Sequence, residues 1–333
     1  MSERRRESSA QHPRAAPPVN DPAAPRVFTA DEVRARVPPR RARLLVEAAL
    51  SGGFDPATDP PRVHAPAGAG HLLLMPSTLG GWSGVKVASV VPDNPAAGLP
   101  RIQATYVLMD AATLTPRAIL DGASLTALRT PAVSAVAADH LAAPDAAELL
   151  VFGTGPQAVG HVVALADIRP FTRVRVVGRS PAKVADVIAQ VGARGVTAVA
   201  GSVGDVAGAD VVACATAADE PLFHGALVRD GACVVAIGSH EPGRRELDAG
   251  LMGRALVVVE DPGTALREAG DVVRAVEEGA LDPAGLVGLG ALVRGEVARR
   301  EDRPNVFKGT GMAWQDLAVA AGVVGATERS PLP

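Results

Sequence analysis

The sequence predicts an α/β protein with a Rossmann-type, doubly wound parallel sheet and room for a second domain. The first observation is a strand, a glycine turn, a helix and a second strand, which follow one another between residues 148 and 180. The second is the chain beyond them, where short apolar runs alternate with helical patterns, as parallel strands joined by crossover helices require. A length of 333 residues is enough for two ordinary domains.

The glycine turn follows the apolar run Glu148–Phe152 and reads Gly153-Thr154-Gly155-Pro156-Gln157-Ala158. Alanine stands where the dinucleotide-binding pattern often has its third glycine. Glycines let the backbone approach a pyrophosphate, and the N-terminus of the following helix offers it free N–H groups. The turn therefore predicts a nicotinamide dinucleotide site. A tight turn in another kind of α/β domain is the alternative.

The end of the second strand favours NADP(H) over NAD(H). An NAD site usually places Asp or Glu there to bind the ribose 2′-hydroxyl. Here the residues are Gly178-Arg179-Ser180, and Lys183 follows. An arginine can form a bidentate pair with a 2′-phosphate. The alternative is that Arg179 stacks on the adenine without discriminating between the two cofactors.

Two later apolar runs, Val211–Ala215 and Cys233–Ile237, read as further strands of this sheet. Ligands of such sheets bind beyond the carboxyl ends of the strands. We therefore expect Thr216, Gly238 and His240, which follow these runs, to lie near the cofactor. The two cysteines, Cys214 and Cys233, lie inside the runs, so we expect buried free thiols and no metal site.

Lys86 is the only charged residue in the apolar strand 85–91. A buried ammonium must be paired or have a lowered pKa, which is unusual enough to suggest function. An edge strand with Lys86 facing solvent is the alternative. Further on, a helix is expected from Thr115 to about Leu128, where Arg129-Thr130-Pro131 interrupts it. Thr130 would then cap a new helix, and Arg129 and Thr130 would form an anion site at its N-terminus. A solvated turn is the alternative.

Composition excludes several classes of protein. A net charge of −3 argues against nonspecific binding to nucleic acid, and aromatic residues make up only 3% of the chain. No run approaches the length of a membrane-spanning helix. The tail 1–26 lacks the apolar segment of a secretory signal and is expected to be disordered. We therefore expect a cytoplasmic protein without a nucleic-acid or membrane partner.

From about Arg62 to Leu317 the chain resembles the ornithine cyclodeaminase/mu-crystallin family. The resemblance is carried by several stretches at characteristic distances: Gly84-Val85-Lys86-Val87, Pro92-Asp93-Asn94, Leu125-Thr126-Ala127-Leu128-Arg129-Thr130, the glycine turn, Glu246-Leu247, Gly270-Asp271 and Phe307-Lys308-Gly309-Thr310-Gly311. It implies a substrate-binding and dimerisation domain of α+β type, made of residues 27–130 and 304–325. Residues 131–303 would form the Rossmann domain, and the protein would be a homodimer.

The resemblance also implies residue roles. Arg62, Lys86 and Arg129 would surround an amino-acid or imino-acid substrate. Arg62 and Arg129 would hold its carboxylate, and Lys86 would hold it or relay a proton. Thr130 would reach the pyrophosphate of the cofactor. Charge-assisted donors of this kind suit a carboxylate that is buried beside a nicotinamide.

Three departures from the cyclodeaminase pattern matter, and the missing carboxylate at the nucleotide site, which resembles the NADPH-dependent ketimine reductases of the family, favours a reductase. His240 replaces an Asp that holds the departing amino group, Arg179-Ser180 replaces a carboxylate at the nucleotide site, and Arg101 replaces a small residue. We therefore expect NADPH-dependent reduction of a cyclic or substituted imino acid, a ketimine of the 1-pyrroline-2-carboxylate type, with His240 able to supply a proton. A His merely packed at the strand end is the alternative.

Other functions stay open at this stage. One is an ornithine or lysine cyclodeaminase that releases ammonia. Another is an amino-acid condensing synthase, in which Arg101 would hold a second carboxylate or a phosphate. A third is a nucleotide-binding protein that has lost catalysis, although Lys86 and Arg129 argue against it.

Overall fold

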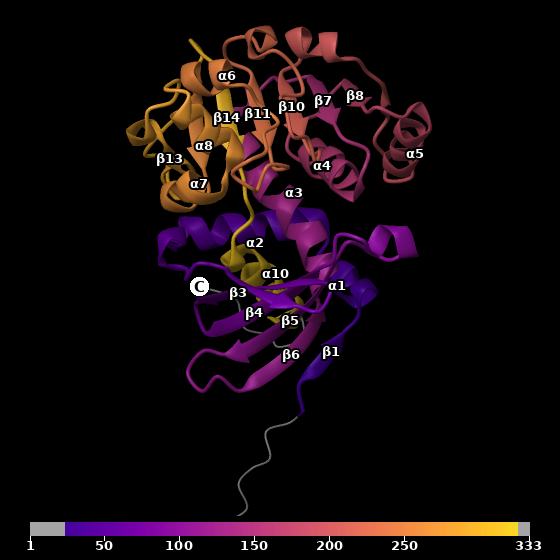
Figure 1. Ribbon diagram of the computed structural model, residues 1–333, viewed down its shortest axis with the longest axis vertical. Coiled ribbons are helices and arrows are strands. Elements are labelled where there is room, and N and C mark those ends of the chain that lie inside the picture. The colour runs from indigo at the N-terminus through magenta and orange to yellow at the C-terminus, as the bar shows by residue number, and fades with distance from the viewer. Residues whose placement is uncertain (1–23, 326–333) are drawn as a thin grey trace, which may run out of the picture.

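The computed structural model describes residues 24–325, which form two units that appear as the upper and lower lobes in Figure 1. The lower, six-stranded unit has the sheet order β1-β6-β5-β4-β3-β2. Its strands are β1 (Arg26–Phe28), β2 (Val63–Ala67), β3 (Gly70–Leu79), β4 (Trp82–Val90), β5 (Ile102–Asp110) and β6 (Pro116–Asp121). Strands β2 to β6 pair antiparallel, and β1 pairs parallel to β6.

Three helices belong to the six-stranded unit: α1 (Ala30–Arg36), α2 (Pro39–Ser51) and the final helix α10 (Ala313–Gly325). The residues of α10 are buried from Ala313 to Val324, because the helix lies between the sheet and helices α2 and α3 (Gly122–Leu141). An apolar helix with many small residues suits such a position, since it can approach its neighbours closely on every side. The last described helix thus lies in the same unit as the first described strand.

The upper, eight-stranded unit is a parallel sheet in the order β13-β12-β14-β11-β10-β7-β8-β9. Its strands are β7 (Glu148–Phe152), β8 (Arg173–Val177), β9 (Val199–Ala200), β10 (Val211–Cys214), β11 (Cys233–Ala236), β12 (Leu256–Val259), β13 (Val287–Gly288) and β14 (Asn305–Lys308). The helices are α4 (Pro156–Ala166), α5 (Pro181–Gly192), α6 (Ala249–Arg254), α7 (Pro262–Glu268), α8 (Gly270–Glu277) and α9 (Leu289–Val293). The predicted fold class, a Rossmann-type sheet plus an α+β domain, is confirmed.

The chain order reverses beside β7, which pairs with β8 on one side and β10 on the other. This is the switch point at which such sheets bind ligands. Cys214 and Cys233 are buried and free, as expected.

Strand β14 was not foreseen in the sequence. It pairs with β11 on one side and β12 on the other, so the eight-stranded sheet extends to Lys308. The predicted domain limit at residue 304 therefore falls just before a strand of that sheet. The chain returns to the six-stranded unit only after Lys308.

Helix α3 corrects a second prediction. The segment Pro116–Asp121 is strand β6 rather than helix, and α3 runs without interruption through Pro131. The Asp121 Oδ1 accepts a hydrogen bond of 2.7 Å from the Ser124 N–H, which caps the real start of the helix. Thr130 is therefore no N-cap, and the predicted domain limit at 130/131 falls inside α3. Pro131 lies against Gly160 of α4, where the absence of a side chain makes room for the proline ring.

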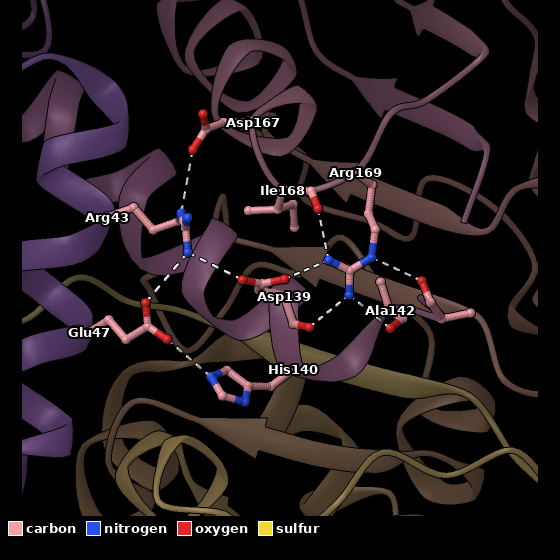
Figure 2. A network of polar contacts seen from close by, with 9 residues as sticks. Arg43, Glu47, Asp139, His140, Ala142, Asp167, Ile168 and Arg169 are labelled. Carbon is pink, nitrogen blue, oxygen red and sulfur yellow. Dashed lines mark hydrogen bonds and ion pairs between the residues drawn. The ribbon is translucent and has the colours of Figure 1, made fainter. Parts of the chain in front are cut away.

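An ion-pair network joins the two units where α2 meets α3 and the end of α4 (Figure 2). The guanidinium of Arg43 lies 3.2 Å from Asp139 Oδ2 and 3.6 Å from Asp167 Oδ2. Arg169 binds the other oxygen of Asp139 at 2.5 Å and also donates to the Ala142 and Ala143 carbonyls at the end of α3. The network therefore holds α2 of the six-stranded unit against the ends of α3 and α4.

The predicted disordered tail lies mostly outside the described residues, and its last residue, Arg26, begins β1. Among the helices between residues 24 and 325, none combines the length and apolar character needed to cross a membrane.

Candidate active site

Lys86 lies in the middle of the six-stranded sheet and is 3% exposed. Its strand, β4, pairs with β3 and β5, so the edge-strand interpretation is wrong. The Nζ donates to Asp316 Oδ2 at 2.7 Å and to Thr126 Oγ1 at 3.2 Å. Burial lowers the pKa of Lys86 to about 8, the charge of Asp316 opposes that shift, and Arg129 adds to it.

Arg129 reaches the same carboxylate from helix α3. Its Nε lies 3.5 Å from Asp316 Oδ1, and its Nη1 donates to Gln315 Oε1 at 3.1 Å. Gly311 makes room for the guanidinium, because a Cβ there would lie 2.3 Å from Arg129 Nη1, and its φ of +80° suits glycine. A side chain at residue 311 would therefore displace Arg129.

Arg62 approaches from the chain that leads into β2. Its Nη2 donates to the Gly311 carbonyl at 2.7 Å and lies 2.9 Å from Glu268 Oε2, which belongs to the eight-stranded unit. Burial lowers the pKa of Arg62, the charges of Glu268 and Glu260 oppose this, and the neighbouring Arg129 lowers it further. The structure thus brings Arg62, Lys86 and Arg129 together, as the sequence suggested.

Glu260, at the end of β12, anchors the segment that borders these three cations. Its Oε2 accepts hydrogen bonds of 2.8 Å from both the Thr310 and Gly311 N–H groups. Its Oε1 accepts one of 2.6 Å from Gln315 Nε2. Sequence reasoning missed Glu260, Gln315 and Asp316. A signal existed for Asp316, which is the only charged residue of the apolar helix α10.

The glycine turn has the geometry that a dinucleotide requires. Gly153 has a φ of +127°, and a Cβ there would lie 2.4 Å from the Ala215 carbonyl oxygen. Gly155 is exposed at the start of α4, with open space where a side chain would stand. The buried Gln157 Oε1 has no hydrogen-bond partner within the described part of the chain. An open, glycine-lined helix N-terminus at the switch point fits a pyrophosphate.

Arg179 and Ser180 lie where β8 ends and α5 begins. Ser180 is the N-cap of α5, and its Oγ accepts a hydrogen bond of 3.5 Å from the Lys183 N–H. Arg179 is exposed, and neither Arg179 nor Lys183 forms a salt bridge with any residue between 24 and 325. Gly178 lets the glycine turn approach this strand end, because a Cβ there would lie 2.3 Å from Thr154 Cγ2.

Thr216 and Gly238 are bound by one buried carboxylate, Glu246. Its Oε1 accepts from the Thr216 N–H and hydroxyl at 2.7 Å each, and its Oε2 accepts from the Gly238 N–H at 2.7 Å. The Glu246 N–H in turn donates to Asp271 Oδ1 at 2.7 Å. Sequence reasoning did not assign Glu246 or Asp271 to the site, although both lie in stretches that carry the family resemblance.

Lys308 completes this second group of charges. It is fully buried at the end of β14, with its Nζ 3.1 Å from Asp271 Oδ2, and Ser239 Oγ donates to the same oxygen. His240 follows Ser239 and is exposed, yet partial desolvation and then the positive charge of Lys308 lower its pKa. Among the three cations of the site, the charge of Arg62 also lowers the pKa of His240.

Two residues lie elsewhere than the sequence suggested. Thr130 is buried inside α3, one residue from the contact between Pro131 and Gly160, and not at a helix N-terminus. Arg101 is exposed in the connection between β4 and β5 and forms no hydrogen bond or ion pair with Arg62, Lys86 or Arg129.

Comparisons with known proteins agree with this architecture. A sequence model of the ornithine cyclodeaminase/mu-crystallin family matches residues 30–329. A Δ1-pyrroline-2-carboxylate reductase of Bacillus cereus is 35% identical over 257 residues, which cover 74% of this chain and 79% of the relative. The ketimine reductase mu-crystallin of Rattus norvegicus is 33% identical over 311 residues, covering 89% and 96%. The structure of Thermococcus litoralis Δ1-pyrroline-2-carboxylate reductase with NADH and L-proline superposes with a TM-score of 0.84 at 26% identity, covering 91% and 97%.

Proposed function

Because this chain belongs to the ornithine cyclodeaminase/mu-crystallin family and is a nicotinamide-dependent oxidoreductase, we propose that it reduces a cyclic or substituted imino acid with NADPH. The proposed substrate is a ketimine of the 1-pyrroline-2-carboxylate type, and the product is the corresponding amino acid. The observation that carries the proposal is the convergence of Arg62, Lys86 and Arg129 on the segment 309–316.

The cation group suits an anionic substrate. In the protein alone, Arg62 is paired with Glu268, while Lys86 and Arg129 share Asp316. Arg62 and Arg129 each keep guanidinium donors that can turn to a carboxylate in a bidentate pair. We propose that these two residues bind the substrate carboxylate and so fix which end of the imine faces the cofactor. Burial strengthens such contacts, since little water competes for them.

Lys86 is the proposed proton donor to the imine nitrogen. With a pKa of about 8, its ammonium is mostly protonated at pH 7 and is far more acidic than an ordinary lysine. Its proton passes to the nitrogen, and the neutral amine is reprotonated from solvent after product leaves. Bound cofactor supplies the hydride that the imine carbon accepts. His240 is the weaker candidate, because its lowered pKa leaves it mainly neutral at pH 7.

The glycine turn and the start of α5 are the proposed cofactor residues. Gly153 to Ala158 would hold the pyrophosphate at the N-terminus of α4, with Thr130 beside them. Arg179, Ser180 and the positive end of α5 would hold a 2′-phosphate, which is why we propose NADP(H) over NAD(H). Thr216 and Gly238 would border the nicotinamide, in positions fixed by Glu246.

We also propose a homodimer that forms through the six-stranded unit. Six of the ten large apolar side chains exposed within the described residues belong to that unit, namely Val27, Leu44, Val63, Leu99, Ile102 and Leu114. We propose that the partner subunit covers some of these side chains. Light scattering at several concentrations would measure the assembly.

A substrate screen tests the proposed function. Absorbance of NADPH is followed with 1-pyrroline-2-carboxylate and 1-piperideine-2-carboxylate, and NADH is run in parallel. We expect NADPH consumption with at least one of the two imines. A protein that binds NADPH and consumes it with neither would refute the substrate class. Ammonia release from ornithine or lysine without net change in cofactor would instead support a cyclodeaminase, which the exposed His240 in place of a carboxylate disfavours.

A further inference from the structure

The candidate site has two halves, the cation group of Arg62, Lys86 and Arg129 and the glycine turn at residues 153–158. Helices α3 and α4 cross between these two halves. Helix α3 carries Arg129 and Thr130, and the next residue, Pro131, lies against Gly160 of α4. A Cβ on Gly160 would lie 2.7 Å from Pro131 Cγ, so the absence of a side chain at residue 160 lets the proline ring pack there. Gly160 is about one helical turn beyond the first residue of α4. The crossing therefore connects a proposed substrate-binding residue to the proposed cofactor-binding turn.

A buried histidine fixes this crossing. His161 is fully buried, with its Nδ1 2.7 Å from the Gln157 carbonyl oxygen and its Nε2 2.9 Å from Ser134 Oγ. A carbonyl oxygen only accepts, so Nδ1 carries the proton and Nε2 accepts the hydrogen bond of the Ser134 hydroxyl. Burial lowers the pKa of His161 to about 4, so the ring keeps this neutral form at physiological pH.

The two partners of His161 belong to the two halves of the site. Gln157 is in the first turn of α4 and is one of the glycine-turn residues that we predict to bind the cofactor. Ser134 lies on α3 four residues beyond Thr130, on the same face of that helix. The imidazole ring is rigid, and the close contact between Pro131 and Gly160 leaves little room for α3 and α4 to move relative to one another. We therefore expect a shift of the first turn of α4 to move the part of α3 that holds Arg129.

We infer that the hydrogen bond between His161 and Ser134 is a positioning contact that holds the cofactor-binding turn of α4 and couples it to Arg129 on α3. His161 and Ser134 touch neither ligand in this account, and they act through Gln157, Thr130 and Arg129. The identity of the two ligands rests on the proposed function. The contact between the helices does not.

Ser134→Ala tests the inference, because it removes one hydroxyl and leaves the bond between His161 and Gln157. The matched control is Ser124→Ala, also in α3 and 3% exposed, whose hydroxyl donates to the Asp121 carbonyl at the start of the helix, away from α4. NADPH affinity is measured by fluorescence titration, and L-proline affinity with and without NADP⁺ by calorimetry. We expect Ser134→Ala to weaken NADPH binding about threefold to tenfold and to reduce the effect of cofactor on proline binding, with Ser124→Ala within about twofold of the wild type.

A second variant, His161→Gln, examines the bond from the other side. Both substitutions remove the same hydrogen bond, that between His161 and Ser134. The double variant should therefore weaken NADPH binding no more than His161→Gln alone. Unchanged NADPH affinity in Ser134→Ala, an equal loss in Ser124→Ala, or an additive double variant would each overturn the inference. A wild-type protein that reduces no imino acid, while Ser134→Ala still loses NADPH affinity, would refute the proposed function and leave this inference standing.

Discussion

The Asp316 Oδ2 on helix α10 lies 2.7 Å from the Lys86 Nζ on strand β4, although 230 positions separate the two residues in the chain. The other carboxylate oxygen, Oδ1, lies 3.5 Å from Arg129 Nε. One fully buried carboxylate thus faces two of the three cations of the candidate site. Burial lowers the pKa of Lys86, and the charge of Asp316 opposes that shift and so helps to keep the lysine protonated.

Asp316→Asn should shift the pH dependence of the reaction. The pKa of Lys86 is about 8 in the wild type, and Asp316 raises it against the lowering effect of burial. Reduction needs the protonated lysine, so kcat/KM should fall as pH rises through about 8. Without the carboxylate charge the pKa of Lys86 falls further, and the alkaline limb moves to lower pH. The measurement is kcat/KM for imine reduction between pH 6 and 10, and an unmoved limb would count against Lys86 as the donor.

Arg179→Ala should change the choice of cofactor. The exposed guanidinium has no salt-bridge partner among residues 24–325, so its loss costs little stability. We expect KM for NADPH to rise about tenfold or more, because a charge-assisted contact to the 2′-phosphate is lost, while KM for NADH stays near its original value. Arg194→Ala is the control, since within residues 24–325 that exposed arginine near the end of α5 donates only to the Gln190 carbonyl. An equal change in KM for NADPH and NADH would show that Arg179 does not bind the 2′-phosphate.

The network around Arg43 should stabilise the junction of the two units. Arg43 is only 13% exposed and faces three carboxylates, those of Glu47, Asp139 and Asp167. Arg43→Leu should lower the free energy of unfolding by about 1–3 kcal/mol, since it leaves Asp167 without its partner. Arg34→Leu removes an exposed pair with Asp31 and should cost less than about 1 kcal/mol. Urea unfolding measures both, and similar losses would mean that the network adds no more than a surface pair.

Much of the fold could be predicted because its signals are local. The strand, glycine turn and helix from Glu148 to Ala166 follow from residues that are neighbours in the chain, and the structure has them at the expected places. The single charge of Lys86 in an apolar strand suggested a buried ammonium but left a solvent-facing edge strand open, and the pairing of β4 on both sides decides for burial. The same reasoning, applied to α10, would have singled out Asp316.

The errors arose where distant segments decide local structure. Pro131 suggested a helix boundary, but α3 continues past it, and the proline ring packs against Gly160 of a helix that the local sequence does not reveal as a neighbour. Strand β14 is followed by glycines and is recognisable only from its two partners, β11 and β12. The anchoring role of Glu260 depends on Thr310 and Gly311, which the chain brings to it from 50 residues away. No local pattern reports such a contact.

The role of Lys86 is the central claim of this account, and Lys86→Met tests it most directly. Methionine has a similar length and no charge, so the site keeps its volume while the proton donor is removed. The measurement is kcat/KM for NADPH-dependent reduction of 1-pyrroline-2-carboxylate, with the NADPH dissociation constant determined on the same sample. We predict a loss of at least about a hundredfold in kcat/KM, with NADPH affinity within about twofold of the wild type. Reduction at near the wild-type rate in Lys86→Met would contradict the account.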